Sequence, residues 1–215
     1  MDNQTRQLGT LVLVRHGQSL WNAKHTWTGL TDIGLSEQGM TEAKQAATAL
    51  KDIPFTVAFS SALCRAKDTL HIILTELGKT DIPVIESTEL NERNYGIFTG
   101  KNKLEVEKEF GPEKYKQLRR GWDFPVENGE SLKDVYTRVV PYYETTIVPL
   151  LQKGTTVLVV AHGNSLRALL KRVSSISDTD IAQVEFATGE IIIVTVDAKG
   201  NAVTQTKRTV PQYVT

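Results

Sequence analysis

The fold is decided by Leu11-Val12-Leu13-Val14, which runs into Arg15-His16-Gly17, and by Thr156-Val157-Leu158-Val159-Val160-Ala161, which runs into His162-Gly163. Both stretches are short apolar runs rich in β-branched residues, and both stop at a histidine followed by a glycine. This pattern is typical of a buried strand that ends in a loop. A single histidine after a strand is more often structural than catalytic. Two in matching settings favour catalysis.

Helical and strand patterns alternate around these two runs. Apolar residues recur at helical spacing over residues 36–51, 63–77, 131–151 and 166–173, and Pro141 should kink the third helix or start a new segment. Further strands are expected at residues 56–59, 84–85 and, as the last strand, 191–196. Residues 91–130 are polar and should form a long irregular segment with one or two short helices.

This alternation predicts an α/β protein, a three-layer α/β/α sandwich with a mostly parallel central sheet. Ligand sites in such sheets gather beyond the carboxyl ends of the strands. We therefore expect His16 and His162 to lie at one edge of the sheet, in the same site.

Length and composition indicate an ordinary globular protein. The 215 residues are 40% hydrophobic and 23% charged, and they are expected to form one domain over residues 1–215 with flexible tails at 1–9 and from about 205 to 215. Lys plus Arg and Asp plus Glu both count 25, so nothing attracts the whole chain to nucleic acid or to an anionic membrane. The polar N-terminus and the lack of a long apolar run favour a cytoplasmic protein.

Arginine and histidine gather at the predicted strand ends, and this combination suits a phosphate group. Arg15 precedes His16, and Arg65 opens a helix just after the second strand. A guanidinium binds phosphate oxygens through paired hydrogen bonds, and an imidazole nitrogen can attack phosphorus to give a phosphohistidine. Gly17 and Gly163 would let the backbone come close to the ligand. No metal-binding motif is present, and the arginines would repel a cation, so no metal is expected.

These residues carry a resemblance to the histidine phosphatase superfamily. The opening signature is Leu13-Val14-Arg15-His16-Gly17-Gln18-Ser19 with Trp21-Asn22. Within the superfamily, the chain resembles the 2,3-bisphosphoglycerate-dependent phosphoglycerate mutases over about residues 11 to 195. The more specific stretches are Leu90-Asn91-Glu92-Arg93-Asn94-Tyr95-Gly96 and Ala161-His162-Gly163-Asn164-Ser165-Leu166-Arg167.

The resemblance implies a role for each matching position. His16 would become the phosphohistidine, and Glu92 would be the general acid and base. The remaining residues would hold the phosphoryl group or the rest of an anionic phosphoglycerate: Arg15, Asn22, Thr28, Gly29, Arg65, Tyr95, Lys103, Arg119, Arg120, His162, Gly163 and Asn164. It also implies 2,3-bisphosphoglycerate as the primer, no metal, and a homodimer or homotetramer without nucleic-acid or membrane partners.

The sequence departs from the family's pattern in two regions. Many of these mutases have a longer insertion after the arginine pair, whereas here residues 121–130 lead straight to Ser131, and the C-terminal tail shows little resemblance. Three hypotheses follow: a mutase interconverting 3-phosphoglycerate and 2-phosphoglycerate in glycolysis and gluconeogenesis, a phosphomonoesterase on the same scaffold, and a non-catalytic binding protein. The joint presence of His16, Glu92 and His162 argues against the third.

Overall fold

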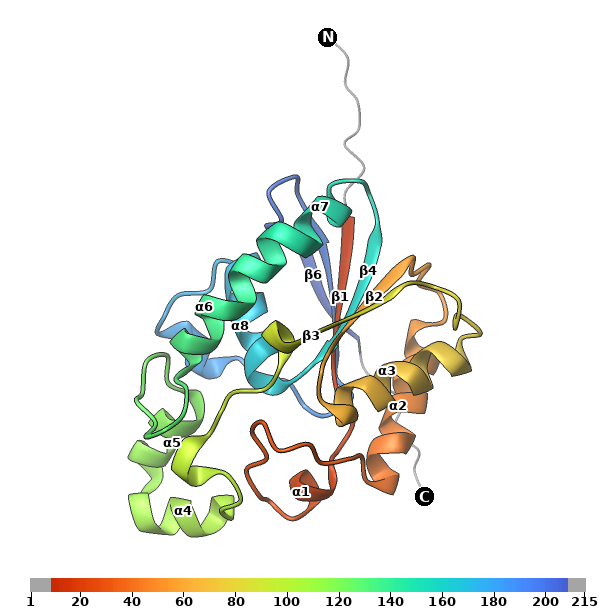
Figure 1. Cartoon of the computed structure of the whole chain (residues 1–215). Helices are drawn as coiled ribbons and strands as arrows, with labels where there is room; N and C mark the ends of the chain where they lie inside the picture. The colour runs from red at the N-terminus through yellow and green to blue at the C-terminus, as the bar shows by residue number, and fades with distance from the viewer. Residues whose placement is uncertain (1–8, 209–215) are drawn as a thin grey trace.

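A computed structural model describes residues 9–208 and contains one six-stranded sheet with the order β3-β2-β4-β1-β5-β6 (Figure 1). The strands are β1 (Gly9–Arg15), β2 (Val57–Ser61), β3 (Val84–Ser87), β4 (Thr156–Ala161), β5 (Ile191–Val196) and β6 (Ala202–Arg208). β1, β2, β3 and β4 run parallel to one another, and β5 is antiparallel to both of its neighbours, β1 and β6. The predicted mostly parallel sheet is confirmed.

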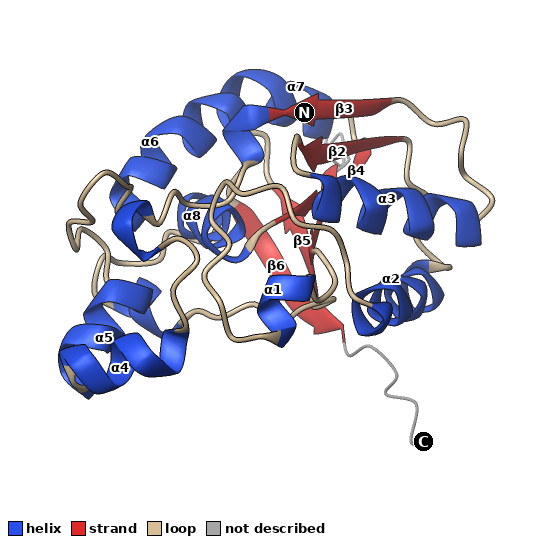
Figure 2. Cartoon of the chain, turned by 60° about the horizontal axis from the view of Figure 1, so that its bottom comes forward, coloured by secondary structure: helices blue, strands red, loops and turns tan. Residues whose placement is uncertain are grey.

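Alternate side chains of β1 enter two separate cores, one on each face of the sheet. Leu11 and Leu13 pack with α6 (Leu132–Tyr142), η3 (Tyr143–Ile147), α7 (Val148–Leu151) and α8 (Gly163–Val173). Val12 and Val14 pack with α2 (Glu37–Leu50) and α3 (Cys64–Glu76) on the opposite face (Figure 2). This two-sided covering makes β1 and β4 apolar throughout and confirms the three-layer sandwich.

The predicted long helix over residues 131–151 is continuous but irregular. Pro141 lies inside α6, and the chain widens into the π-helical turn η3 two residues later before α7 resumes. Proline removes one backbone donor and crowds the preceding turn. The helical path nevertheless continues past Pro141 to Leu151.

The carboxyl edge of the parallel strands is covered by the chain's polar segments (Figure 1). They comprise α1 (Leu20–Ala23), η1 (Thr88–Leu90), η2 (Gly96–Phe98), α4 (Lys103–Phe110), α5 (Pro112–Arg120) and η4 (Asp180–Gln183). A small third core holds α4 and α5 in place: Trp27, Phe98, Val106, Tyr115, Leu118 and Val126. The expected long segment with two short helices is confirmed.

Two boundaries predicted near the C-terminus are wrong. β5 is not the last strand, because residues 202–208 return beside it as the edge strand β6. Residues 205–208, expected in a flexible tail, therefore belong to the sheet, and Arg208 donates to the Ala49 carbonyl and the Asp52 carboxylate. Gly9 likewise already belongs to β1. The rest of the two expected tails, residues 1–8 and 209–215, lies outside the described residues.

No helix found between residues 9 and 208 combines the length and the apolar character needed to cross a membrane.

Candidate active site

Three strand ends bring the predicted catalytic residues together. His16 follows β1, His162 follows β4, and Arg65 lies in the first turn of α3 after β2. The two imidazole rings are 4.8 Å apart between centroids and meet edge to face. His16 and His162 are 2% and 0% exposed. Two residues that lie far apart in the sequence thus form one buried pair.

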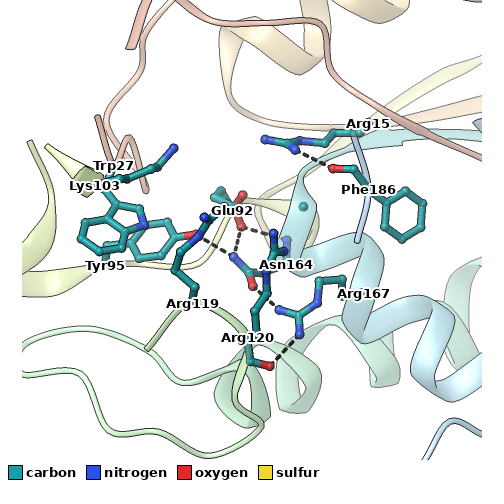
Figure 3. A pocket seen from close by; sticks show the side chains of 11 residues that line it. Arg15, Trp27, Glu92, Tyr95, Lys103, Arg119, Arg120, Asn164, Arg167 and Phe186 are labelled. Carbon is teal, nitrogen blue, oxygen red and sulfur yellow. Dashed lines mark hydrogen bonds between the residues drawn. The ribbon is translucent and has the colours of Figure 1, made fainter. Parts of the chain in front are cut away.

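Two adjoining hollows extend from this pair toward α4 and α5. The inner hollow is lined by Arg15, His16, Asn22, Trp27, Thr28, Gly29, Arg65, Glu92, Tyr95 and Lys103. The outer hollow is lined by Arg15, Trp27, Glu92, Tyr95, Lys103, Arg119, Arg120, Gly163, Asn164, Arg167 and Phe186 (Figure 3). Every predicted site residue lines one of them except His162, whose ring meets that of His16 edge to face. Trp27, Arg167 and Phe186 were not predicted.

The ring of His16 has a defined orientation. Its Nδ1 lies 2.6 Å from the Gly17 carbonyl oxygen, which can only accept, so Nδ1 carries the hydrogen. Burial, together with the nearby charges of Arg65 and Arg15, holds the pKa of His16 well below its ordinary value. The ring is therefore neutral near pH 7, with a lone pair on Nε2. A neutral imidazole with a free Nε2 is a competent nucleophile.

Three buried polar atoms close to His16 have no hydrogen-bond partner among the described residues. They are Arg15 Nε, Thr28 Oγ1 and His162 Nδ1. A buried polar group without a partner is uncommon, because it loses its bonds to water and gains none in return. Such atoms gathered at one end of a hollow indicate the place of a polar ligand.

The two arginines of the inner hollow are fixed by carbonyl groups and not by acids. Arg15 Nη1 donates to the Phe186 carbonyl at 2.6 Å. Arg65 donates to the Gly29 carbonyl at 2.8 Å and to the Thr31 carbonyl at 3.0 Å. A carbonyl orients a guanidinium without neutralising it. Both positive charges therefore remain available to an anion.

Glu92 lies between the two hollows in a network of donors. Its Oε1 accepts from the backbone N–H groups of Arg93 at 2.8 Å and Asn164 at 3.2 Å, and from Asn164 Nδ2 at 3.0 Å. Asn164 Nδ2 also donates to the Tyr95 hydroxyl at 2.9 Å (Figure 3). All three hydrogen bonds that Glu92 accepts are made to Oε1. Oε2, with no partner in the part of the chain that the structure describes, is free for a ligand.

Arg167, which was not among the predicted site residues, orients this network. Its Nη1 donates to Asn164 Oδ1 at 3.0 Å, and its Nη2 donates to the Arg120 carbonyl at 2.8 Å (Figure 3). Nη2 also donates to the Ile181 carbonyl at 2.8 Å. An arginine only donates, so the amide oxygen of Asn164 must face it. The amide NH₂ then points at Glu92.

The outer hollow is strongly basic. Lys103 begins α4, and Arg119 and Arg120 form the last turn of α5. Burial, reinforced by Arg119 and Arg15, lowers the pKa of Lys103 to about 8. Glu185, which does not line the outer hollow, forms an ion pair with Arg120. Among the described lining residues Glu92 is the only acid, so this hollow is suited to a ligand with several negative charges.

The prediction that Gly17 lets the backbone come close to a ligand is wrong. A Cβ at this position would lie 2.2 Å from the Gly39 carbonyl oxygen, so Gly17 is required for packing against α2. Gly163 does border the site. A Cβ there would lie 3.7 Å from Glu92 Oε2 and 3.8 Å from Arg15.

The short segment 121–130 is bonded tightly to the segment that carries Glu92. Asn94 N–H donates to Glu130 Oε2 and Ile97 N–H to the Glu127 carbonyl, at 2.8 and 3.1 Å. Gly96 has a φ of 49°, and a Cβ on it would lie 1.9 Å from the Glu127 carbonyl oxygen. This loop therefore supports residues 92–97 directly.

Within residues 9–208, no three His, Cys, Asp or Glu side chains gather as a metal site would require.

A buried, neutral histidine with surrounding arginines and one carboxylate is the arrangement expected of enzymes that transfer phosphoryl groups through histidine. The comparison with known proteins agrees, because a model of the histidine phosphatase superfamily (branch 1) matches residues 11–209. The chain belongs to this superfamily.

Proteins that are similar to this chain in sequence carry mutase names. The chain is 47% identical to a 2,3-bisphosphoglycerate-dependent phosphoglycerate mutase of Parvibaculum lavamentivorans, covering 90% of this chain and 93% of the relative. It is 46% identical to a phosphoglycerate mutase of Schizosaccharomyces pombe, covering 91% and 93%. Among solved structures, a mycobacterial glucosyl-3-phosphoglycerate phosphatase in complex with VO3 has a TM-score of 0.78 at 23% identity, covering 93% and 97%. That likeness confirms the fold.

Proposed function

We propose that this protein is a 2,3-bisphosphoglycerate-dependent phosphoglycerate mutase, which interconverts 3-phosphoglycerate and 2-phosphoglycerate through a phosphohistidine at His16. The observation that carries the proposal is the neutral, buried His16, whose Nε2 has no hydrogen-bond partner among residues 9–208, beside the unpartnered buried atoms Arg15 Nε, Thr28 Oγ1 and His162 Nδ1. Relatives at 46–47% identity over nine-tenths of the chain support the substrate.

His16 is the nucleophile of the first step. Its Nε2 lone pair forms a bond to phosphorus while the phosphorus–oxygen bond of the donor breaks. The donors on Arg15, Thr28, Arg65 and His162 stabilise the charge on the phosphoryl oxygens during transfer. Bound 2,3-bisphosphoglycerate supplies the phosphoryl group that primes His16.

Glu92 moves the proton. When the hydroxyl of a phosphoglycerate attacks phosphohistidine, the hydroxyl proton passes to the free Oε2 of Glu92 and the nitrogen–phosphorus bond breaks. When His16 takes the other phosphoryl group back, Glu92 returns that proton to the departing oxygen. The donors on Oε1 fix the carboxylate in place for both transfers.

The outer hollow holds the rest of the substrate. A phosphoglycerate carries a carboxylate and a phosphate, and the primer carries one phosphate more. Lys103, Arg119 and Arg120 provide the positive charge that these groups need, with Asn22, Gly29, Tyr95, Gly163 and Asn164 as polar neighbours. The residues present therefore fit the primer. No step needs a metal, because the arginines and Lys103 supply the positive charge.

The proposal extends to the setting of the enzyme. We place the reaction in glycolysis and gluconeogenesis, in the cytoplasm, and treat the matched span as one catalytic domain. The homodimer or homotetramer implied by the resemblance stays a prediction, which analytical ultracentrifugation tests.

The competing function is phosphomonoester hydrolysis, in which water takes the phosphoryl group from His16. One assay separates the two. Purified protein is given 3-phosphoglycerate with and without 2,3-bisphosphoglycerate, and 2-phosphoglycerate and free phosphate are measured together. We expect isomer formation that depends on the primer and far exceeds phosphate release. Phosphate without isomer would overturn the mutase assignment. Activity should also survive a chelator, and its loss would contradict the metal-free mechanism.

A further inference from the structure

The two ring nitrogens of His162 have very different surroundings. Nε2 lies 2.6 Å from the hydroxyl oxygen of Ser61. Nδ1 is buried and has no partner among residues 9–208. His162 is fully buried, and its ring meets that of His16 at a centroid distance of 4.8 Å. Any role of His162 at the phosphoryl group must therefore be performed by Nδ1.

Ser61 is placed against His162 by the sheet. It is the last residue of β2, and β2 and β4 are neighbouring parallel strands, so their carboxyl ends lie side by side. Ser61 is fully buried, and its oxygen accepts the Leu63 N–H at 3.3 Å. A hydroxyl has one hydrogen and two lone pairs. With one lone pair used by Leu63, the hydrogen of Ser61 is available to His162 Nε2.

The charge of the His162 ring limits where its hydrogens can lie. Burial and the positive charges of Arg65 and Arg15 hold the pKa of His162 well below its ordinary value, so the ring is neutral near pH 7. A neutral imidazole has one donor and one acceptor nitrogen. If Nε2 carried the hydrogen, the Nδ1 lone pair would face the phosphoryl oxygens and repel them. If Ser61 donates to Nε2, the hydrogen lies on Nδ1 and faces the anion.

We propose that Ser61 is a positioning residue that fixes His162 in the Nδ1–H tautomer, so that Nδ1–H donates to the phosphoryl group on its way to or from His16. The hydrogen bond at one nitrogen sets the role of the other. His16 is fixed in the same tautomer by the Gly17 carbonyl. The two rings then have different roles: His16 presents a lone pair at Nε2 as the nucleophile, and His162 presents a proton at Nδ1 as a hydrogen-bond donor.

The tautomer is measured directly by nitrogen–proton NMR on protein labelled with ¹⁵N-histidine, with His162 assigned through a His162→Gln variant. We expect the Nδ1–H pattern for His162 in the wild type at neutral pH. Ser61→Ala should shift it toward Nε2–H, and Ser61→Thr, which keeps the hydroxyl, should restore Nδ1–H. The matched control is Ser60→Ala, because Ser60 is similarly buried but donates to the Ser61 carbonyl and makes no hydrogen bond to the His162 ring within residues 9–208.

Kinetics give the second readout. The functional consequence rests on the proposed phosphohistidine chemistry, and losing one donor to a developing anion should lower kcat of Ser61→Ala by about 10- to 100-fold with little change in KM. Ser61→Thr should recover most of the wild-type kcat, and the kcat of Ser60→Ala should stay near that of the wild type.

The inference would be overturned if the His162 ring of the wild type carried its hydrogen on Nε2, or if the tautomer were unchanged in Ser61→Ala. The wild-type spectrum decides even if Ser61→Ala fails to fold. A failed mutase assay would leave the spectrum unaffected, so the two proposals fail separately.

Discussion

The centre of this site and its rim are built by different means. The centre, defined as His16, Arg65 and His162, is at most 2% exposed and stands on the ends of three sheet strands and the helix that follows one of them. The rim, defined as Lys103, Arg119 and Arg120, is only partly buried and stands on two short helices over the small third core. The centre is set by the main fold, whereas the rim depends on a satellite cluster.

This difference separates two functions, the acceleration of phosphoryl transfer and the binding of the substrate. Groups fixed by buried strands and carbonyl bonds need no rearrangement when charge develops on the phosphoryl oxygens, so they act on the rate of transfer. Charges on the rim meet the distant carboxylate or phosphate of the substrate equally in the ground state and the transition state, so they act on affinity. Substitutions in the centre should therefore lower kcat, and those in the rim should raise KM.

The largest effect is expected at His16. His16→Gln removes the nucleophile and should lower activity on the order of 10⁴-fold or more, with no acid-labile phosphoprotein formed from ³²P-labelled 2,3-bisphosphoglycerate. His71→Gln is the matched control, since His71 is exposed on α3. Retained labelling of His16→Gln would mean that another residue is phosphorylated.

The next largest effect is expected at Glu92, where centre and rim meet. Glu92→Gln keeps the shape but loses the proton carrier, so kcat with phosphoglycerate should fall about 10²- to 10⁴-fold. The burst of nitrophenol from p-nitrophenyl phosphate should change much less, because that leaving group needs no proton. Glu89→Gln, a nearby carboxylate outside both hollows, is the control. Equal losses with both substrates would contradict the proton-transfer role.

A smaller effect of a different kind is expected at Arg119. Arg119→Gln removes one charge from the outer hollow and should raise KM for 3-phosphoglycerate about 10- to 100-fold, as one charge-assisted hydrogen bond would, with kcat nearly unchanged. Lys116→Gln removes the same charge from an exposed position of the same helix and should change neither constant. A fall in kcat alone would break the division between centre and rim.

The centre was predictable from sequence because its residues follow the strongest local patterns. The apolar runs before His16 and His162 must be buried strands, and parallel strands meet at one edge. The residues that were missed have no such pattern. Phe186 contributes its backbone carbonyl to Arg15, which any residue could provide, and Arg167 acts through Asn164.

The errors have physical reasons as well. β6 is an edge strand with mostly exposed side chains, so its sequence lacks the alternation that marks a half-buried strand. The need for glycine at position 17 comes from Gly39, a contact between segments that no local pattern reveals. Local periodicity predicts the elements, whereas contacts distant in sequence decide details such as these.

The smallest effect, and the finest test of the rim, is a dependence on pH. The pKa of Lys103 is lowered to about 8, so in the free enzyme the side chain is charged below pH 8 and becomes neutral above it. An anionic substrate binds the charged form better, and KM for 3-phosphoglycerate should therefore rise above pH 8, by up to about tenfold per pH unit. Lys103→Arg stays charged and should give a KM that changes little between pH 7 and 9.5. The kcat of both proteins should change much less than KM over this range, since the centre does not include Lys103.

A KM that rises identically in wild type and Lys103→Arg would assign the pH dependence to another group. A KM that is flat in both would show that Lys103 does not bind the substrate's charge.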